Sequence, residues 1–260
     1  MIALYTDFGV SGYYVGQLKA VLLQHAPSVP VIDLMHDAPT FDPQAAAYLL
    51  AALVKEFPPH TVFLCVVDPG VGSQRKPMIV KAGQQWFVGP DNGLFTIVMQ
   101  QALPKNKFEC WDINWQPQRL SATFHGRDLF APVAAKLANN GAVPGESRTL
   151  DTDNMNVWPG DLHKIIYVDH FGNAVSGVRA DGLFNTKAST NASTKSNTGV
   201  STKAVIVNDH LIPNANTFSD VAVGQGFWYQ NANGLVEIAV NQGRADQQFR
   251  LSIGSTIRFV

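Results

Sequence analysis

Apolar and polar positions follow two different patterns along the chain, and the change falls near residue 150. Up to that point, short apolar runs of strand length alternate with segments whose apolar residues recur about every three to four positions. We expect strands at residues 2–5, 29–34, 61–67, 78–81 and 86–88, and helices at 14–25, 42–57, 93–101 and 129–138. This alternation of strands and helices predicts an α/β fold with a mostly parallel sheet and right-handed crossovers.

After residue 158 the helical periodicity ends, and short β-like runs separated by turn residues take its place. This spacing is typical of a small all-β barrel or sandwich. Asp, Asn, Pro and Gly accumulate over residues 148–161, where we place the boundary. We therefore expect a Rossmann-like N-terminal α/β domain over residues 1–155 and a small C-terminal β-barrel domain over 160–260. Within the latter, residues 187–203 are rich in Ser, Thr, Asn and Lys, which predicts a flexible surface excursion.

Composition and charge exclude several classes of protein. Hydrophobic residues make up 46% of the chain and charged residues 15%, as in globular proteins. The net charge of -1 offers no electrostatic footprint for nucleic acid or an anionic membrane. Cys65 and Cys110 are too few for a disulfide framework and show no zinc spacing. The sequence has no apolar run of about 18 residues and no signal-peptide pattern, so we expect a cytoplasmic protein.

The strand predicted at residues 61–67 runs into a glycine-rich loop that holds an acid and a base, Asp68 and Arg75. Ligands of open α/β sheets bind just beyond the carboxyl ends of the strands, where Asp68 stands. His125 lies in another loop before a helix, where a histidine can handle a proton or an anion. The three side chains make one polar cluster if their strands are neighbours. Taken singly, each also fits a structural role, as a turn cap, a surface charge or a helix-start residue.

Asp7 ends the first predicted strand and is followed by a glycine at position 9. A carboxylate at this place can accept hydrogen bonds from both hydroxyls of a ribose, as in nucleotide-binding α/β folds. It can equally tie down the loop that follows. Neither G-x-G-x-x-G nor G-x-x-x-x-G-K-[ST] comes after the strand, so no pyrophosphate or triphosphate grip is indicated. A nucleoside without phosphates remains compatible with the sequence.

The second half carries a further group of candidate binding residues. Phe171 offers a flat face for a base, while Asp169 and Asn173 offer hydrogen bonds to its edge or to a charged amine. The same residues also fit a tight β-turn around Gly172. Glu237 follows an Asn-Gly hairpin turn, and a ligand role for it is weakly specified.

These motifs together resemble the S-adenosyl-L-methionine (SAM) hydroxide adenosyltransferases, relatives of the fluorinating and chlorinating enzymes that use SAM. The matching runs are TDFG at 6–9, DPGVG at 68–72 with Arg75, GPDNG at 89–93, FHGRD at 124–128, DHFGN at 169–173 and EIAVN at 237–241. The resemblance covers nearly the whole chain in the right order, and residues 187–203 fall outside it.

The resemblance implies hydrolysis of SAM to adenosine and L-methionine by activated water or hydroxide at C5′, with no metal and no cofactor. It makes Asp68, Arg75 and His125 the activating set. The substrate-binding residues would be Asp7 for the ribose, Phe171 and Asn173 for adenine, Asp169 for the methionine amine, and in addition Asn92, Asn233 and Glu237. It also implies a homotrimer, with each active site between one subunit's first domain and the next subunit's barrel.

Halogenation of SAM and a regulatory SAM- or adenosine-binding module without turnover are the alternatives. The halogenating relatives carry an aromatic residue at the position of Asp68, and the fluorinating ones have an extra loop that this chain lacks, so water is favoured over halide. They also have a serine–arginine pair where this chain has Ala232-Asn233. An acid–base pair at a strand end argues against a pure binding module, which needs no water-activating cluster. Whether Asp68 or His125 takes the proton stays open.

Overall fold

The computed structural model describes residues 1–103, 108–150, 158–184 and 204–260. They form two compact units, Met1–Gly160 and Asp161–Val260. Residues 187–203, the predicted excursion, lie outside the described residues. Within the described ranges, no helix is both long enough and apolar enough to cross a membrane.

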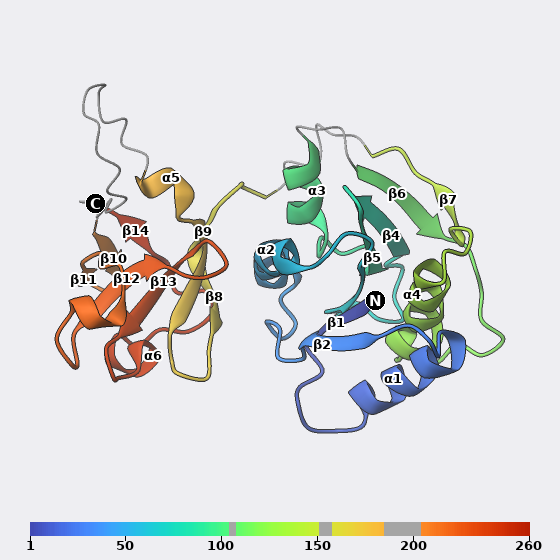
Figure 1. Ribbon diagram of the computed structural model, residues 1–260, viewed down its shortest axis with the longest axis horizontal. Helices are drawn as coiled ribbons and strands as arrows, with labels where there is room; N and C mark the ends of the chain where they lie inside the picture. Colours follow the sequence, from blue (N-terminus) through green and yellow to red (C-terminus); the bar gives the residue numbers. More distant parts are fainter. Residues whose placement is uncertain (104–107, 151–157, 185–203) are drawn as a thin grey trace. The chain divides into compact units, whose positions relative to one another are not determined.

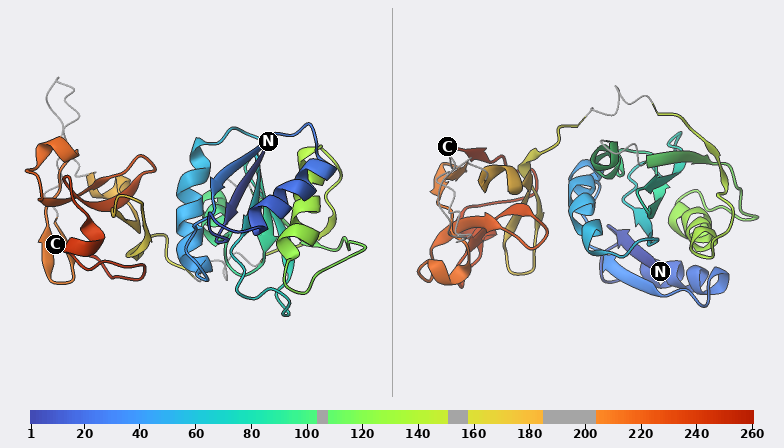
Figure 2. Two further views of the ribbon diagram at one scale, coloured as in Figure 1. Left: turned by 90° about the horizontal axis from the view of Figure 1, so that it is seen from below. Right: turned by 45° about the horizontal axis from the view of Figure 1, so that its top comes forward.

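A mixed sheet, with seven strands in the described part of the chain, forms the centre of the first unit (Figure 1). Its order is β2 (Val31–Met35), β1 (Ile2–Thr6), β3 (Val62–Val66), β5 (Gln85–Pro90), β4 (Pro77–Ala82), β6 (Phe108–Ile113) and β7 (Gly145–Ser147). One face is covered by α2 (Pro43–Leu53) and α3 (Thr96–Ala102), the other by α1 (Tyr14–His25) and α4 (Ala131–Ala138) (Figures 1 and 2). The first unit is therefore a three-layer α/β structure.

The central strands are apolar at successive positions because both faces of the sheet are buried. On β1, Leu4 shares an apolar cluster with Leu18 of α1. Tyr5 points to the opposite face, where its hydroxyl donates to the Ala46 carbonyl of α2 at 2.9 Å. The alternation along β1 thus attaches one helical layer to each face of the sheet.

The start of α2 confirms a local prediction from the sequence. The Asp42 side chain caps the helix by accepting a hydrogen bond from the backbone N–H of Ala45 at 3.0 Å, and Pro43 occupies the first turn. The α-helix ends at Leu53 and continues as a short 3₁₀ turn, Val54–Glu56. The predicted end at residue 57 is close to the end of that turn.

The sheet is mixed, and the prediction of a mostly parallel sheet is wrong. β2, β1, β3 and β5 run parallel, whereas β4, β6 and β7 run antiparallel to their neighbours. The cause is the connection between β4 and β5, which consists of Gly83, with φ +62°, and Gln84. So short a loop can join only antiparallel strands, since a parallel pair needs a crossover of roughly a dozen residues.

The second unit contains two antiparallel sheets among its described residues. The larger has the order β12 (Gly226–Gln230), β13 (Leu235–Val240), β9 (Ala174–Arg179) and β8 (Leu162–Val168); the smaller has β11 (His210–Ile212), β10 (Val205–Val207) and β14 (Arg258–Phe259). Two short helices, α5 (Asp181–Phe184) and α6 (Ala245–Gln248), lie in the same unit. One apolar core takes side chains from both sheets, among them Val205, Trp228 and Ile238.

The predicted barrel is not closed among the described residues. Isolated bridges join Lys164 to Thr256 and Asn214 to Trp228, one residue pair at each place. A closed barrel needs a continuous ladder between every pair of neighbouring strands. The described part of the unit is therefore a pair of antiparallel sheets that share a core.

Candidate active site

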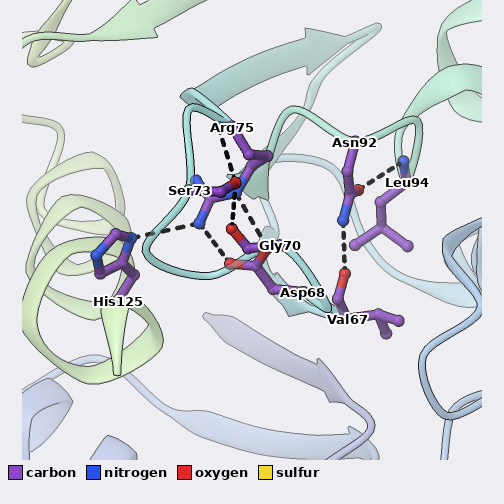
Figure 3. Close-up of polar contacts among 8 residues, drawn as sticks. All are labelled: Val67, Asp68, Gly70, Ser73, Arg75, Asn92, Leu94 and His125. Carbon is purple, nitrogen blue, oxygen red and sulfur yellow. Dashed lines mark hydrogen bonds and ion pairs between the residues drawn. The ribbon is translucent and has the colours of Figure 1, made fainter. Parts of the chain in front are cut away.

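Asp68 and Arg75 form a buried ion pair just beyond the end of β3 (Figure 3). Arg75 Nε donates to Asp68 Oδ1 at 3.0 Å, and Arg75 Nη2 donates to Asp68 Oδ2. Only 4% of the Asp68 side chain and 7% of the Arg75 side chain are exposed. A bidentate pair with so little exposure holds both groups in one orientation.

His125 completes the cluster from a distant part of the chain. Its Nδ1 lies 3.3 Å from Arg75 Nη2, although 50 residues separate the two. A guanidinium can only donate, so Nδ1 carries a lone pair and the neutral ring holds its proton on Nε2. Burial lowers the pKa of His125, and the positive charge of Arg75 lowers it further. The structure thus brings the three predicted side chains together around a neutral imidazole.

The loop between Asp68 and Arg75 is tied internally by a serine that sequence reasoning missed. Ser73 Oγ donates to the Gly70 carbonyl at 2.7 Å and accepts the backbone N–H of Arg75 at 3.2 Å. Gly72 has a φ of +78°, and a Cβ there would lie 2.6 Å from the Ala122 carbonyl oxygen. The one available signal was the serine after two glycines, a residue type that often bonds to nearby backbone in turns.

His125 is held by the rest of its own motif. It precedes a single π-helical turn, Gly126–Phe130, a form that often marks functional sites. Asp128 accepts hydrogen bonds from the Ser121 backbone N–H at 2.8 Å and from Arg127 Nε at 2.6 Å. The Arg127 guanidinium also lies 4.9 Å from the centre of the Phe124 ring. Arg127 and Asp128 therefore fix the loop that presents His125.

Asn92 supports the same strand end. Its Nδ2 donates to the Val67 carbonyl at 2.8 Å, and its Oδ1 accepts the Leu94 N–H at 3.3 Å (Figure 3). The Nδ2 end thus binds backbone immediately before Asp68, and the Oδ1 end binds the turn that contains Asn92 itself. Its predicted contact with substrate stays a prediction.

Asp7 and Asp68 lie at the same edge of the sheet because they follow two adjacent parallel strands. Thr6 of β1 is paired with Val66 of β3; Asp7 follows Thr6 directly, and Asp68 comes two residues after Val66. Asp7 Oδ2 accepts the backbone N–H of Phe41 at 3.2 Å. Burial raises the pKa of Asp7, and the negative charge of Asp68 adds to the rise.

A cavity of about 330 Å³ opens at this edge, and Asp7, Asp68 and His125 line its polar side. Its apolar wall is aromatic, and the Tyr14 ring lies 5.3 Å from the Phe124 ring. Sequence reasoning placed Tyr14 on a helix and missed it as a wall residue, because only the packing of α1 brings it to the cavity. A carboxylate and a neutral imidazole on one wall can hold a water between an acceptor and a donor.

The second unit has its own cavity, of about 640 Å³, lined by Asp169, Phe171, Asn173 and Glu237. Asp169 accepts the Asn173 backbone N–H at 2.8 Å and its Nδ2 at 3.0 Å, while Gly172 has a φ of +83°. The tight turn considered from the sequence therefore exists. It leaves Phe171 71% exposed at the cavity, so the turn and a binding role are compatible.

Glu237 lies at the wall of this second cavity and is only 6% exposed. It accepts hydrogen bonds from the Tyr229 hydroxyl at 2.6 Å and from Asn231 Nδ2 at 2.9 Å. Burial raises the pKa of Glu237 and also that of Tyr229. Asn233 belongs to the adjacent turn, where its N–H donates to Asn231 Oδ1 at 3.0 Å. Sequence reasoning missed Tyr229, whose aromatic strand position carried no separate signal.

Comparison with known proteins gives consistent matches over both units. A family model described as the SAM hydroxide adenosyltransferase N-terminal domain matches residues 2–145, and one described as its C-terminal domain matches residues 163–258. An (R)-S-adenosyl-L-methionine hydrolase of Thermus thermophilus is 34% identical over 98% of this chain and 97% of its own. A fluorinase of Actinopolyspora mzabensis is 25% identical over 99% of this chain and 96% of its own. The crystal structure of an uncharacterized conserved protein from Thermotoga maritima matches with a TM-score of 0.82 and 31% identity, covering 100% of this chain and 99% of that one.

Proposed function

The chain belongs to the SAM hydroxide adenosyltransferase family, and we propose that it hydrolyses S-adenosyl-L-methionine to adenosine and L-methionine. The observation that carries this function is the buried Asp68–Arg75–His125 cluster, of which Asp68 and His125 line the first-unit cavity. A site that only bound its ligand would have no need to bury such a cluster.

Hydrolysis of SAM at C5′ requires the protein mainly to position one water molecule. An oxygen–C5′ bond forms while the C5′–S bond breaks, and its electron pair returns to sulfur, which leaves as the neutral thioether of methionine. No general acid is needed for this leaving group. One proton of the water stays on the new 5′-hydroxyl and the other must depart. Aligning the water with the C5′–S bond can contribute about 7–11 kcal/mol in favourable cases.

Asp68, His125 and Arg75 have separate roles in this reaction. His125 Nδ1 is engaged by Arg75, so the free ring nitrogen is a donor and offers no lone pair for a proton. The departing proton is therefore accepted by Asp68, since water becomes a strong acid as its oxygen bonds to carbon. The Nε2–H of His125 donates to the nucleophilic oxygen. Arg75 stays protonated and fixes the orientation of both partners.

In this proposal the substrate contacts the first unit of one subunit and the second unit of the next subunit in a homotrimer. Asp7 accepts the ribose hydroxyls in the first-unit cavity. In the second-unit cavity, Phe171 stacks on adenine, Asn173 bonds to its edge and Asp169 receives the methionine amine. Glu237, Asn92 and Asn233 support these surfaces through the hydrogen bonds described above.

The relatives' names specify the R epimer of the substrate, and we infer the same preference here. The two sulfonium epimers place the methionine chain differently around the same C5′ carbon. The test is a comparison of kcat/KM for the separated epimers. Equal rates would contradict the preference without contradicting hydrolysis.

A homotrimer is part of the proposal, with the first-unit cavity of one subunit completed by the second unit of the next. Two large apolar side chains at the two cavities support this assembly, because both are unusually exposed: Phe41 is 74% exposed and Phe171 is 71% exposed.

For the fold we propose that β2, β1, β3 and β5 correspond to a Rossmann-like half, and that the two sheets of the second unit are an interrupted barrel.

The first experiment is incubation with SAM in ¹⁸O-labelled water, with and without a metal chelator, followed by mass spectrometry. We expect ¹⁸O at C5′ of adenosine and free methionine in both cases, with no cofactor added. Intact SAM despite demonstrable binding would indicate a regulatory module. A product that appears only with halide would indicate halogenation.

A further inference from the structure

A chain of hydrogen bonds runs from the surface of the first unit to the buried end of β1. Lys19 Nζ donates to Asp33 Oδ2 at 2.6 Å, and Asp33 Oδ1 lies 3.0 Å from His36 Nε2. His36 Nδ1 then lies 2.8 Å from Thr6 Oγ1. The side chains of Lys19 and Asp33 are 41% and 44% exposed, whereas His36 is 8% and Thr6 0% exposed. This series of hydrogen bonds therefore ends at Thr6, which directly precedes Asp7 and lies inside the protein.

Each link in this chain has a defined direction. The carboxylate of Asp33 can only accept, so His36 Nε2 donates to it. The pKa of Asp33 is lowered: burial raises it, but the hydrogen bonds from Lys19 and His36 outweigh burial. In the neutral form of the ring, a proton on Nε2 leaves Nδ1 to accept from the Thr6 hydroxyl, while Thr6 Oγ1 accepts the Phe8 N–H at 3.4 Å. Every polar atom of the chain between Asp33 and Phe8 is matched.

Threonine, histidine and aspartate in series are also the parts of an activated nucleophile. Thr6 cannot act as one here, because it is fully buried and does not line the first-unit cavity. No substrate atom can reach its hydroxyl. The arrangement therefore acts on the position of the backbone around it.

The backbone bonds show which segment is positioned. The Gly9 N–H donates to the His36 carbonyl at 2.6 Å, and the Ala38 N–H donates to the Thr6 carbonyl at 3.1 Å. The loop that carries Asp7 is thus tied on both sides to the segment that follows β2. Three residues after Ala38, the same segment donates the backbone N–H that binds the Asp7 carboxylate.

We propose that His36, held by Asp33 and bonded to Thr6, is a positioning residue that sets the placement of the Asp7 carboxylate and hence the affinity for the nucleoside half of the substrate. This inference rests on the proposed function. Binding groups must be held within about 0.5 Å of their productive place. His36 touches no substrate, so its loss acts on binding much more than on the chemical step.

The test compares matched variants of the full-length enzyme. Thr6→Val removes the hydroxyl at constant shape, and we expect the KM for SAM and the Kd for adenosine to rise about tenfold, with kcat within about threefold. Thr6→Ser should restore the wild-type values. Lys19→Ala, at the exposed end of the chain, should change either constant less than about twofold.

Two variants of His36 test its hydrogen bond to Thr6 and its hydrogen bond to Asp33 separately. His36→Asn keeps an acceptor near the place of Nδ1, and His36→Gln keeps a donor near the place of Nε2. We expect the Asn variant to bind adenosine more tightly than the Gln variant, because only it can still bond to Thr6. These variants also serve if Thr6→Val fails to fold. If both variants bound adenosine as tightly as wild type does, the positioning role of His36 would be overturned.

Hydrogen exchange separates this inference from the proposed function. In the ligand-free protein, the Gly9 and Phe41 amides should exchange faster in Thr6→Val than in wild type, and unchanged exchange would refute the inference. Absence of SAM hydrolysis by wild type would instead refute the proposed function, while the exchange result would still decide the positioning of the loop.

Discussion

The two cavities differ in how their charged groups are balanced. In the first unit, Asp68 is neutralised by the bidentate Arg75, and the same guanidinium reaches His125. In the second unit, Asp169 is bonded by the amides of Asn173, and Glu237 by a hydroxyl and an amide. Behind the wall of the first cavity, a guanidinium thus joins an acid to an imidazole. In the second cavity, which Arg244 also lines, the carboxylates accept their hydrogen bonds from neutral donors.

The difference separates chemistry from recognition. A guanidinium shared by a carboxylate and an imidazole fixes where each can accept or donate, which is what the placement of a water requires. Neutral donors orient the carboxylates of the second cavity, and an oriented carboxylate can also accept from an ammonium or from the edge of a base. We therefore expect changes in the first cavity's cluster to lower kcat, and changes in the second to lower affinity.

Asp68→Ala is the sharpest test of this division. Removal of the water-orienting carboxylate should lower kcat by about 10²–10⁴ while the Kd for SAM changes little. The measurement is single-turnover kinetics together with titration calorimetry. A loss of binding as large as the loss of turnover would place Asp68 in the substrate grip.

The matched control for Asp68→Ala is Asp161→Ala. Asp161 also accepts from Arg179 Nε, at 2.8 Å, and from Arg179 Nη2, but it lines neither cavity and is part-exposed. Loss of this pair should leave kcat and KM unchanged, which would show that the position of Asp68 matters and not merely its bonding.

Asp7→Ala sharpens the comparison within the first cavity. Because Asp7 is assigned to the ribose hydroxyls, we expect the Kd for adenosine to rise roughly 10- to 100-fold with kcat within a few-fold. Asp7→Asn retains an acceptor and should recover part of the affinity. Unchanged adenosine binding in Asp7→Ala would refute the ribose role.

Phe171→Ala tests the second cavity. A stacking contact with adenine predicts a loss of about tenfold in affinity for adenosine, again with little effect on kcat at saturation. Leu211→Ala is the control, since Leu211 is an equally prominent exposed apolar residue of the same unit, 65% exposed, that does not line the cavity. Similar losses for both variants would indicate a general effect on the surface.

The pH dependence of kcat and of kcat/KM should distinguish the titration of His125 from that of Asp7, which both line the first cavity. Burial and Arg75 lower the pKa of His125 below its ordinary 6.5, so the ring is neutral at pH 7. We expect kcat to be constant from pH 6.5 upward and to fall below that, by at most about tenfold per pH unit. Because the pKa of Asp7 is raised, its protonation should weaken substrate binding at a higher pH than an ordinary aspartate would, and the fall of kcat/KM on acidification should be steeper than that of kcat. A kcat that falls already between pH 8 and 7 would contradict a neutral His125.

Much of the fold could be predicted because its signals are local. The capped start of α2 at Asp42 and the apolar run of β3 depend on neighbouring residues alone. Strand direction does not: the antiparallel half of the sheet follows from the Gly83-Gln84 hairpin, whose two residues show no strong turn pattern in the sequence. The second unit's strands were largely predicted, but whether their edges closed into a barrel depended on pairing between distant segments.

The types of most elements, the chemistry-bearing residues and the family follow from the amino-acid sequence alone, because each depends on short runs of neighbouring residues. Tertiary packing is what places Arg75 between Asp68 and His125, Tyr14 at the cavity wall, and His36 against Thr6. These contacts bridge distant segments: Arg75 and His125 are 50 residues apart, and Tyr14 meets Phe124 across a still longer stretch of chain. Their geometry follows from strand order and helix packing, which bring together side chains whose meeting no local pattern encodes.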